Sequence, residues 1–176
     1  MKIADIVFSI LPTGNIRRFS VENNHNLFKT DEEPDIVLKT KIKTPPYIKY
    51  KRYEFATAIW DYCQSKGRHI FRFFYSVKNK RSGRTLVLES DFKKGEIIFP
   101  EIITPGQRKL LQNPFGYPLD QLLMISLLHQ MQGLLIHSCG FSCKNKGYLL
   151  IGSSGAGKST LARVIGKKNG VHVLND

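Results

Sequence analysis

The stretch Gly152-Ser153-Ser154-Gly155-Ala156-Gly157-Lys158-Ser159 is the most informative part of this 176-residue sequence. It matches G-x-x-x-x-G-K-[ST], a pattern in which a glycine-rich loop turns so that its backbone N–H groups converge on a phosphate. The glycines are needed because Cβ atoms would obstruct that turn. An apolar run at 148–151 precedes the loop, and a helical apolar pattern at 161–165 follows it. A strand before the loop and a helix after it are the context that this motif requires, so we expect a phosphate-binding P-loop.

The pattern also gives each residue of the motif an expected role. The loop backbone and the N-terminus of the following helix would hold the phosphates. Lys158 would reach the β- and γ-phosphates, Ser159 would provide a hydroxyl ligand to Mg²⁺, and Thr160 would support the α-phosphate. The expected nucleoside-triphosphate-binding set is Gly152, Ser153, Ser154, Gly155, Ala156, Gly157, Lys158, Ser159 and Thr160.

The sequence around this motif, residues 105–176, predicts an α/β nucleotide-binding domain. Prolines and glycines between 105 and 118 interrupt regular structure and mark the boundary of the domain. A buried apolar helix is expected at 119–132, opened by Pro118 and ended by Gly133. The other expected elements are strands at 134–137, 147–151 and 171–174, and a helix at 158–168. Strand, loop, helix and strand in this order are the unit of a parallel sheet.

Residues 1–104 predict a mostly antiparallel β region that is a candidate recognition module. The expected strands are 2–10, 36–43, 55–63, 69–77, 84–90 and 97–99. Their connectors at 64–67 and 79–83 are rich in turn-forming residues, which indicates a meander. The predicted fold class is therefore α/β, with this β region followed by the P-loop domain.

Positive charge is abundant and concentrated in the first of these regions. The formal net charge is +13, and neither 36–52 nor 66–84 contains an acidic residue. Such segments attract polyanions, although a solvated basic face is the simpler interpretation. The aromatic side chains of 71–75 could stack on nucleic-acid bases, but a place in the core of a sheet is favoured.

The cysteines and the apolar runs bear on localisation. Residues 1–11 lack the apolar core of a secretory signal, and polar residues interrupt the longest apolar stretch, 119–136. Cys63, Cys139 and Cys143 have no spacing typical of a disulfide scaffold, so we expect a reduced, cytoplasmic protein without a membrane span. His137, Cys139 and Cys143 could form a metal site, but their spacing is not a common zinc pattern.

The segment Leu135-Ile136-His137-Ser138, the P-loop and the segment Val173-Leu174-Asn175-Asp176 follow one another in an order that resembles the HPr kinase/phosphorylase family. These proteins and their relatives share a phosphoenolpyruvate-carboxykinase-like P-loop fold. The resemblance covers 133–176 well, the preceding helix in part, and the first hundred residues hardly at all.

This resemblance implies an ATP-dependent kinase that uses Mg²⁺ to phosphorylate a serine on a small protein or peptide. It implies that Lys158 and His137 act near the phosphates. It also implies that Asp176 is a Mg²⁺ ligand, with Ser159, or a base toward the acceptor hydroxyl.

The sequence departs from the family pattern after the P-loop. The spacing from the helix to Asp176 is about one residue longer than is usual in the family, and the sequence stops before a second acidic residue. We therefore expect a fragment whose P-loop domain is truncated at its C-terminus, or a chain whose sheet a second chain completes. The alternative function is a nucleotide-sensing module without phosphotransfer, in which 1–104 contact a partner or nucleic acid. An ATP-binding-cassette ATPase is disfavoured because its glutamine loop and signature motif are not visible.

Overall fold

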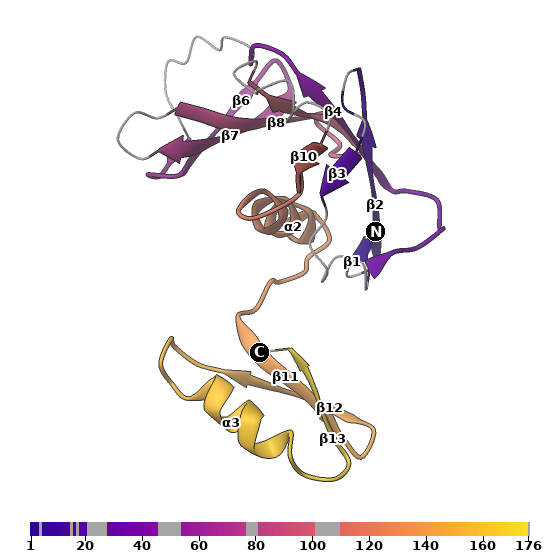
Figure 1. The fold of residues 1–176 in the computed structure, drawn as a ribbon. Coiled ribbons are helices and arrows are strands. Elements are labelled where there is room, and N and C mark those ends of the chain that lie inside the picture. The colour runs from indigo at the N-terminus through magenta and orange to yellow at the C-terminus, as the bar shows by residue number, and fades with distance from the viewer. Residues whose placement is uncertain are drawn as a thin grey trace. The chain divides into compact units, whose positions relative to one another are not determined.

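The computed structural model describes residues 1–3, 5–14, 16, 18–20, 28–45, 54–76, 81–100 and 110–175. Contacts divide the chain into two compact units, Met1–Leu123 and Met124–Asp176, and the division falls inside helix α2 (Leu119–Gln130). The described part is a mixed α/β fold dominated by strands, most of which pair antiparallel (Figure 1). No helix in this part of the chain is long and apolar enough to cross a membrane.

The first unit contains an eight-stranded sheet in the order β1-β2-β4-β9-β8-β7-β6-β5. Its strands are β1 (Lys2–Ile3), β2 (Ile6–Pro12), β4 (Ile36–Ile42), β5 (Phe55–Ala56), β6 (Trp60–Ser65), β7 (Arg68–Ser76), β8 (Arg81–Leu88) and β9 (Lys94–Phe99). The predicted antiparallel meander is confirmed from β5 to β9. However, β4 pairs parallel with both β2 and β9, so the sheet is mixed. A separate parallel pair joins β3 (Arg18–Ser20) to β10 (Leu110–Gln112).

Several predicted boundaries in this unit are wrong. The strand expected at 2–10 is broken at Asp5, whose φ is +62°. The strand expected at 55–63 is the hairpin β5–β6, because the Thr57 hydroxyl accepts hydrogen bonds from the backbone N–H groups of Ile59 and Trp60 and forms a turn. Of the turn predicted at 79–83, residues 81–83 belong to β8, and 79–80 lie outside the described residues. The interruption predicted at 105–118 contains β10, while 105–109 lie outside the described residues.

The main core lies on one face of the large sheet. The cross-strand register brings buried side chains of three neighbouring strands together: Leu38 and Thr40 of β4, Ile97 and Phe99 of β9, and Leu86 and Leu88 of β8. Gly95 belongs to this face, and a Cβ atom there would lie 2.6 Å from the carbonyl oxygen of Val87. A larger residue at 95 would therefore push apart the two central strands.

Arg84 of β8 holds the loop that leads into α2. Its guanidinium donates hydrogen bonds at 3.0–3.2 Å to four carbonyl oxygens, those of Asn113, Pro114, Gly116 and Tyr117. This contact positions a proline-rich segment that has few backbone hydrogen bonds of its own.

The helix that follows this loop is shorter than predicted. It ends at Gln130, and Gln132 rather than Gly133 has the left-handed conformation, with φ +56°. The Gly133 N–H closes the end of the helix on the Leu128 carbonyl at 2.7 Å.

The second unit is a three-stranded sheet with one helix. The strand order is β12-β11-β13, with β11 (Ser138–Cys143), β12 (Lys146–Ile151), α3 (Lys158–Ile165) and β13 (Val171–Asn175). Both outer strands pair antiparallel with β11, so β12 and β13 run parallel to each other without being neighbours. The predicted βαβ order is present, but its strands do not pair directly.

The hairpin in this unit explains one incorrect prediction. Lys144 and Asn145 have φ values of +49° and +59°, as a two-residue type I′ turn requires. That turn pairs Cys143 with Lys146 and Ser138 with Ile151, so β11 begins at Ser138. The strand predicted at 134–137 is therefore wrong, and His137 immediately precedes a strand rather than lying on one. The helix predicted at 158–168 ends at Ile165, where the N–H of Gly166 bonds the Ala162 carbonyl at 2.8 Å.

Candidate functional site

The glycine loop, residues 152–157, connects β12 to α3 and depends on two left-handed glycines. Gly155 has φ +82°, and Gly157, which caps the start of α3, has φ +85°. A Cβ atom at either position would meet no heavy atom within 4 Å, so backbone conformation rather than crowding requires glycine there. Gly152 is different, because a Cβ atom there would lie 3.1 Å from that of Ala156. Glycine is therefore favoured at the three positions of this loop for two separate physical reasons, backbone conformation at Gly155 and Gly157 and close packing at Gly152.

Lys158 links the start of α3 to the start of the glycine loop. Its Nζ donates hydrogen bonds to the carbonyl oxygens of Gly152 at 2.8 Å and Ser153 at 3.0 Å. The side chain is half-buried and lies against the loop backbone. The N-terminus of α3 adds partial positive charge because its first N–H groups lack partners within the helix.

A pocket of about 250 Å³ opens beside this lysine. Its lining combines residues of the glycine loop, the first turn of α3 and the start of β11: Ser154, Gly155, Gly157, Lys158, Ser159, Thr160, His137, Ser138 and Cys139. The structure therefore brings His137 together with the glycine loop, although it is fifteen positions from Gly152. Gly152, Ser153 and Ala156 belong to the loop without lining the pocket. Asp176 lies outside the described residues, so its expected place beside Ser159 stays a prediction.

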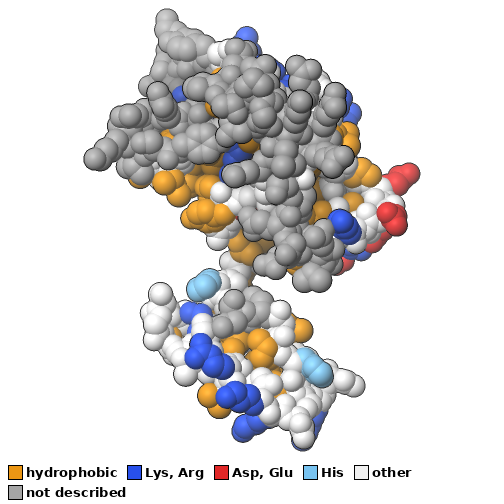
Figure 2. Space-filling view, in the orientation of Figure 1, with side chains coloured by type: hydrophobic (Ala, Val, Ile, Leu, Met, Phe, Trp, Pro, Cys, Tyr) orange, Lys and Arg blue, Asp and Glu red, His pale blue; other side chains and the backbone are white. Residues whose placement is uncertain are grey.

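The electrostatics of the second unit favour an anion. Among the described residues that line the pocket, Lys158 is the one lysine, and none is Asp, Glu or Arg. The sequence from Met124 to Asn175 contains no acidic residue, whereas it contains Lys144, Lys146, Lys158, Arg163, Lys167 and Lys168. Figure 2 shows basic side chains and no acidic ones on the visible face of this unit. A surface of one sign raises the local concentration of polyphosphate.

Two features of this site were missed by the sequence analysis. Ser138 and Cys139 line the pocket. The predicted strand ended at residue 137, before these two residues, whereas β11 begins at Ser138. The sequence patterns singled out the basic segments 36–52 and 66–84, but not the lack of acidic residues from Met124 to Asn175. Counting acidic residues after position 124 would have revealed this feature.

A metal site built from histidine and cysteine is not supported. No group of three or more His, Cys, Asp or Glu side chains in the described residues could hold a metal ion. His137, Cys139 and Cys143 do not form such a group in the structure. All three cysteines of the chain are free thiols, and Cys139 is buried in the hairpin.

Comparisons of the chain with models of protein families, with curated proteins and with solved structures find no match. The geometry of the glycine loop and its pocket is therefore what indicates a function.

Proposed function

We propose that the second unit binds the phosphates of a nucleoside triphosphate at the glycine loop. The observation that carries this proposal is the position of Lys158, whose Nζ lies at hydrogen-bonding distance from the carbonyl oxygens of Gly152 and Ser153, beside a pocket whose described lining residues include no acid. A phosphate in that pocket would receive hydrogen bonds from the ammonium group and from backbone N–H groups at the start of α3. The left-handed glycines leave the space into which phosphate oxygens would fit.

The hydroxyl groups of the first helical turn complete the proposed binding set. Ser159 and Thr160 both line the pocket. Ser159 would hold Mg²⁺, and the family resemblance adds Asp176 as its second protein ligand. Magnesium, when bound, would neutralise charge on the β- and γ-phosphates. The resemblance also suggests ATP as the nucleotide, and free thiols together with ATP suit the cytoplasm.

We further propose that the chain belongs to a kinase that acts on a serine of a small protein or peptide. In this reaction the serine oxygen bonds to the γ-phosphorus while the bond to the β–γ bridging oxygen breaks and ADP leaves. Asp176 would accept the serine proton, and Lys158 would stabilise charge on the transferred group. His137 lines the same pocket and would contact the phosphates.

A nucleotide-sensing module is the second candidate. The described residues that line the pocket include a lysine and hydroxyl groups suited to hold phosphate. Binding alone would need nothing beyond these residues. The kinase would transfer the γ-phosphate to an acceptor, whereas the sensing module would only bind the nucleotide.

An assay with γ-labelled ATP, Mg²⁺ and serine-containing peptides separates the candidates. The assay is run on the chain as given and on a form extended past Asp176, and we expect the extended form to label serine peptides but not the same peptides with alanine in place of serine. Lys158→Ala should abolish the label, whereas Lys146→Ala, at an exposed position on β12, should retain it. Labelling that persists in Lys158→Ala would refute the proposed site. Nucleotide binding without any label would support the sensing module.

A further inference from the structure

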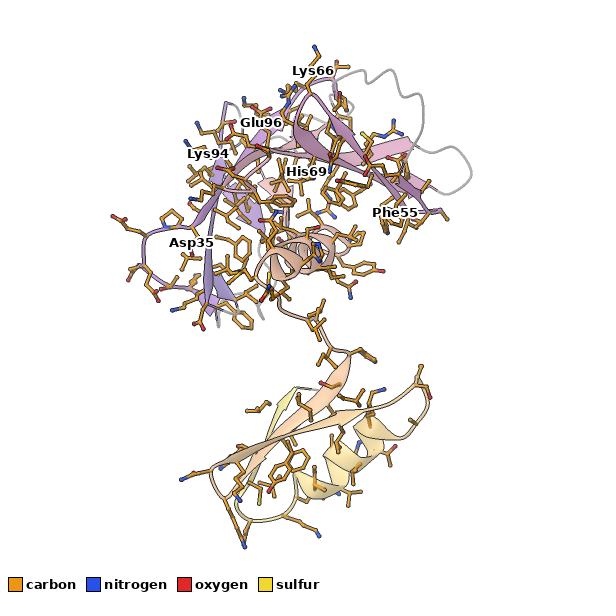
Figure 3. The ribbon with its side chains drawn as sticks, turned by 180° about the vertical axis from the view of Figure 1, so that it is seen from behind. Asp35, Phe55, Lys66, His69, Lys94 and Glu96 are labelled. Carbon is orange, nitrogen blue, oxygen red and sulfur yellow. The ribbon has the colours of Figure 1, made fainter. Side chains whose placement is uncertain are left out.

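The first unit has a pocket of about 370 Å³ on the face of the large sheet opposite its main core. Three cations line it, Lys39 of β4, Arg68 of β7 and Lys94 of β9. The lining also includes two acids, Glu89 and Glu96, and the buried side chain of Val87. The register places Lys39, Glu96 and Val87 in one row across three strands. Lys94 and Glu96 lie two positions apart on β9 and are labelled in Figure 3.

One of the two acids is already neutralised by neighbouring lysines. The Glu96 carboxylate accepts a hydrogen bond from Lys43 Nζ at 2.8 Å and a second, shorter one from Lys41 Nζ. Burial would raise the pKa of Glu96, but the hydrogen bonds from Lys41 and Lys43 outweigh it and leave the pKa lowered. The Glu96 carboxylate therefore stays ionised and is paired with Lys41 and Lys43.

The cations of the pocket are not matched in this way. None of Lys39, Arg68 and Lys94 forms a salt bridge with another described residue. Glu89 is the remaining carboxylate, so three positive charges face one negative charge. Such an excess beside an apolar floor creates a site for a flexible anion that also carries apolar groups.

The lining distinguishes between two kinds of anionic macromolecule. Single-stranded nucleic acid is usually held by aromatic side chains that stack on its bases, and none of the described residues that line this pocket is aromatic. Glu89 would repel a phosphodiester backbone, whereas a polypeptide has N–H groups that can donate to a carboxylate. Carboxylates spaced along an extended segment could each meet one cation.

We propose that this groove binds an acidic segment of a partner protein through Lys39, Arg68 and Lys94. The proposal uses residues of the first unit alone and does not depend on nucleotide binding by the second. If the chain is a protein kinase, this partner is a candidate for its acceptor.

Fluorescence anisotropy of a labelled peptide of glutamate and leucine, titrated with the full chain at low salt, tests this proposal. We expect the double variant Lys39→Glu/Lys94→Glu to bind about tenfold more weakly, a difference of roughly 1.4 kcal/mol. The matched control Lys167→Glu/Lys168→Glu makes the same change in net charge at exposed positions of the second unit and should bind as the unaltered chain does. Equal weakening in both double variants would overturn the proposal, because it would show attraction by net charge alone.

Two further measurements exclude misfolding and the rival ligand. Glu89→Lys adds a cation to the groove and should tighten peptide binding, a gain that a misfolded variant cannot produce. Oligothymidylate of the same net charge should compete poorly, and competition stronger than that of the unlabelled peptide would indicate a nucleic-acid site and overturn the proposal. Lys158→Ala should bind the peptide normally, so failure of the nucleotide proposal and failure of this one can be told apart.

Discussion

The guanidinium of Arg84 donates to four backbone carbonyls of the segment before α2, so one side chain replaces a set of missing backbone hydrogen bonds. Hydrogen bonds to charged groups contribute about 1.5–3 kcal/mol each, and four that share one donor group are not additive. We predict that Arg84→Ala lowers the free energy of unfolding by about 2–3 kcal/mol. Urea denaturation followed by the fluorescence of Trp60, the only tryptophan, measures this change.

Two substitutions make this measurement specific. Arg84→Lys keeps the charge but cannot reach four carbonyls, so it should recover little of the loss. Lys29→Ala removes an exposed cation from the same unit and should change the stability by less than about 0.5 kcal/mol. Recovery by Arg84→Lys to the stability of the unaltered chain would show that charge, rather than the geometry of the guanidinium, is what matters.

His69 predicts a pH dependence in the same unit. Partial burial lowers the pKa of its imidazole below the ordinary value, and its Nδ1 lies 2.9 Å from the hydroxyl of Tyr62. Because Gln64 Nε2 donates to the Tyr62 oxygen at 3.0 Å, the hydroxyl hydrogen is free to point at a neutral imidazole. The folded state therefore disfavours the protonated ring.

The lowered pKa of His69 determines how the free energy of unfolding changes with pH. Since the folded pKa lies below the unfolded one, the contribution of His69 is fully present above the unfolded pKa, about 6.5. It is lost as the pH falls through the folded pKa. We predict that the urea midpoint of the first unit decreases below pH 6.5, and that His69→Gln makes this part of the profile flatter. An unchanged slope in His69→Gln would assign the pH dependence to other groups.

At the scale of elements, α2 has apolar side chains on all sides but buries only some of them. Leu119, Leu123 and Leu127, spaced by four, are buried, and the side chain of Leu123 is 0% exposed. Ile125 is 46% exposed. We predict that Leu123→Ala costs about 2–5 kcal/mol and that Ile125→Ala costs less than about 1 kcal/mol. Thermal denaturation of both variants measures the difference, and equal costs would mean that the face assigned to the core is wrong.

Some elements of the second unit could be located from the sequence alone, and others could not. Glycines at 155 and 157 have φ values that only glycine adopts easily, so the loop between β12 and α3 could be located from residue types alone. The start of β11 could not, because the apolar run 134–137 resembles a strand while the ladder is set by the turn at Lys144-Asn145. The local composition of 134–137 indicated a strand there. The position of β11 is instead set by its register with β12, which the local composition does not show.

At the scale of the whole molecule, pairings between distant segments were beyond the sequence pattern. β2, β4 and β9 pair in parallel although more than fifty residues separate β4 from β9. Alternation of apolar residues predicts which side of a strand is buried, but it does not identify the neighbouring strand. For the same reason the proximity of His137 to the glycine loop could be anticipated only through the family resemblance, and the groove around Lys39 and Lys94 was not anticipated at all.

The distribution of charge connects both proposals at this scale. The formal net charge is +13. The first unit has a groove whose described lining holds three cations and two acids, and the second unit has no acid before Asp176. We interpret these as two binding surfaces for different anions, a protein segment and a polyphosphate. Because they lie in separate units, each can be inactivated by substitution without altering the other.

Isothermal titration of the full chain with ATP and Mg²⁺ is the decisive test of phosphate binding at the glycine loop. We predict saturable binding with one site, loss of at least about tenfold in affinity in Lys158→Ala, and unchanged affinity in Lys146→Ala. A folded chain that binds no ATP, or a Lys158→Ala variant that binds it as tightly as the unaltered chain, would contradict the assignment of the glycine loop as the phosphate site.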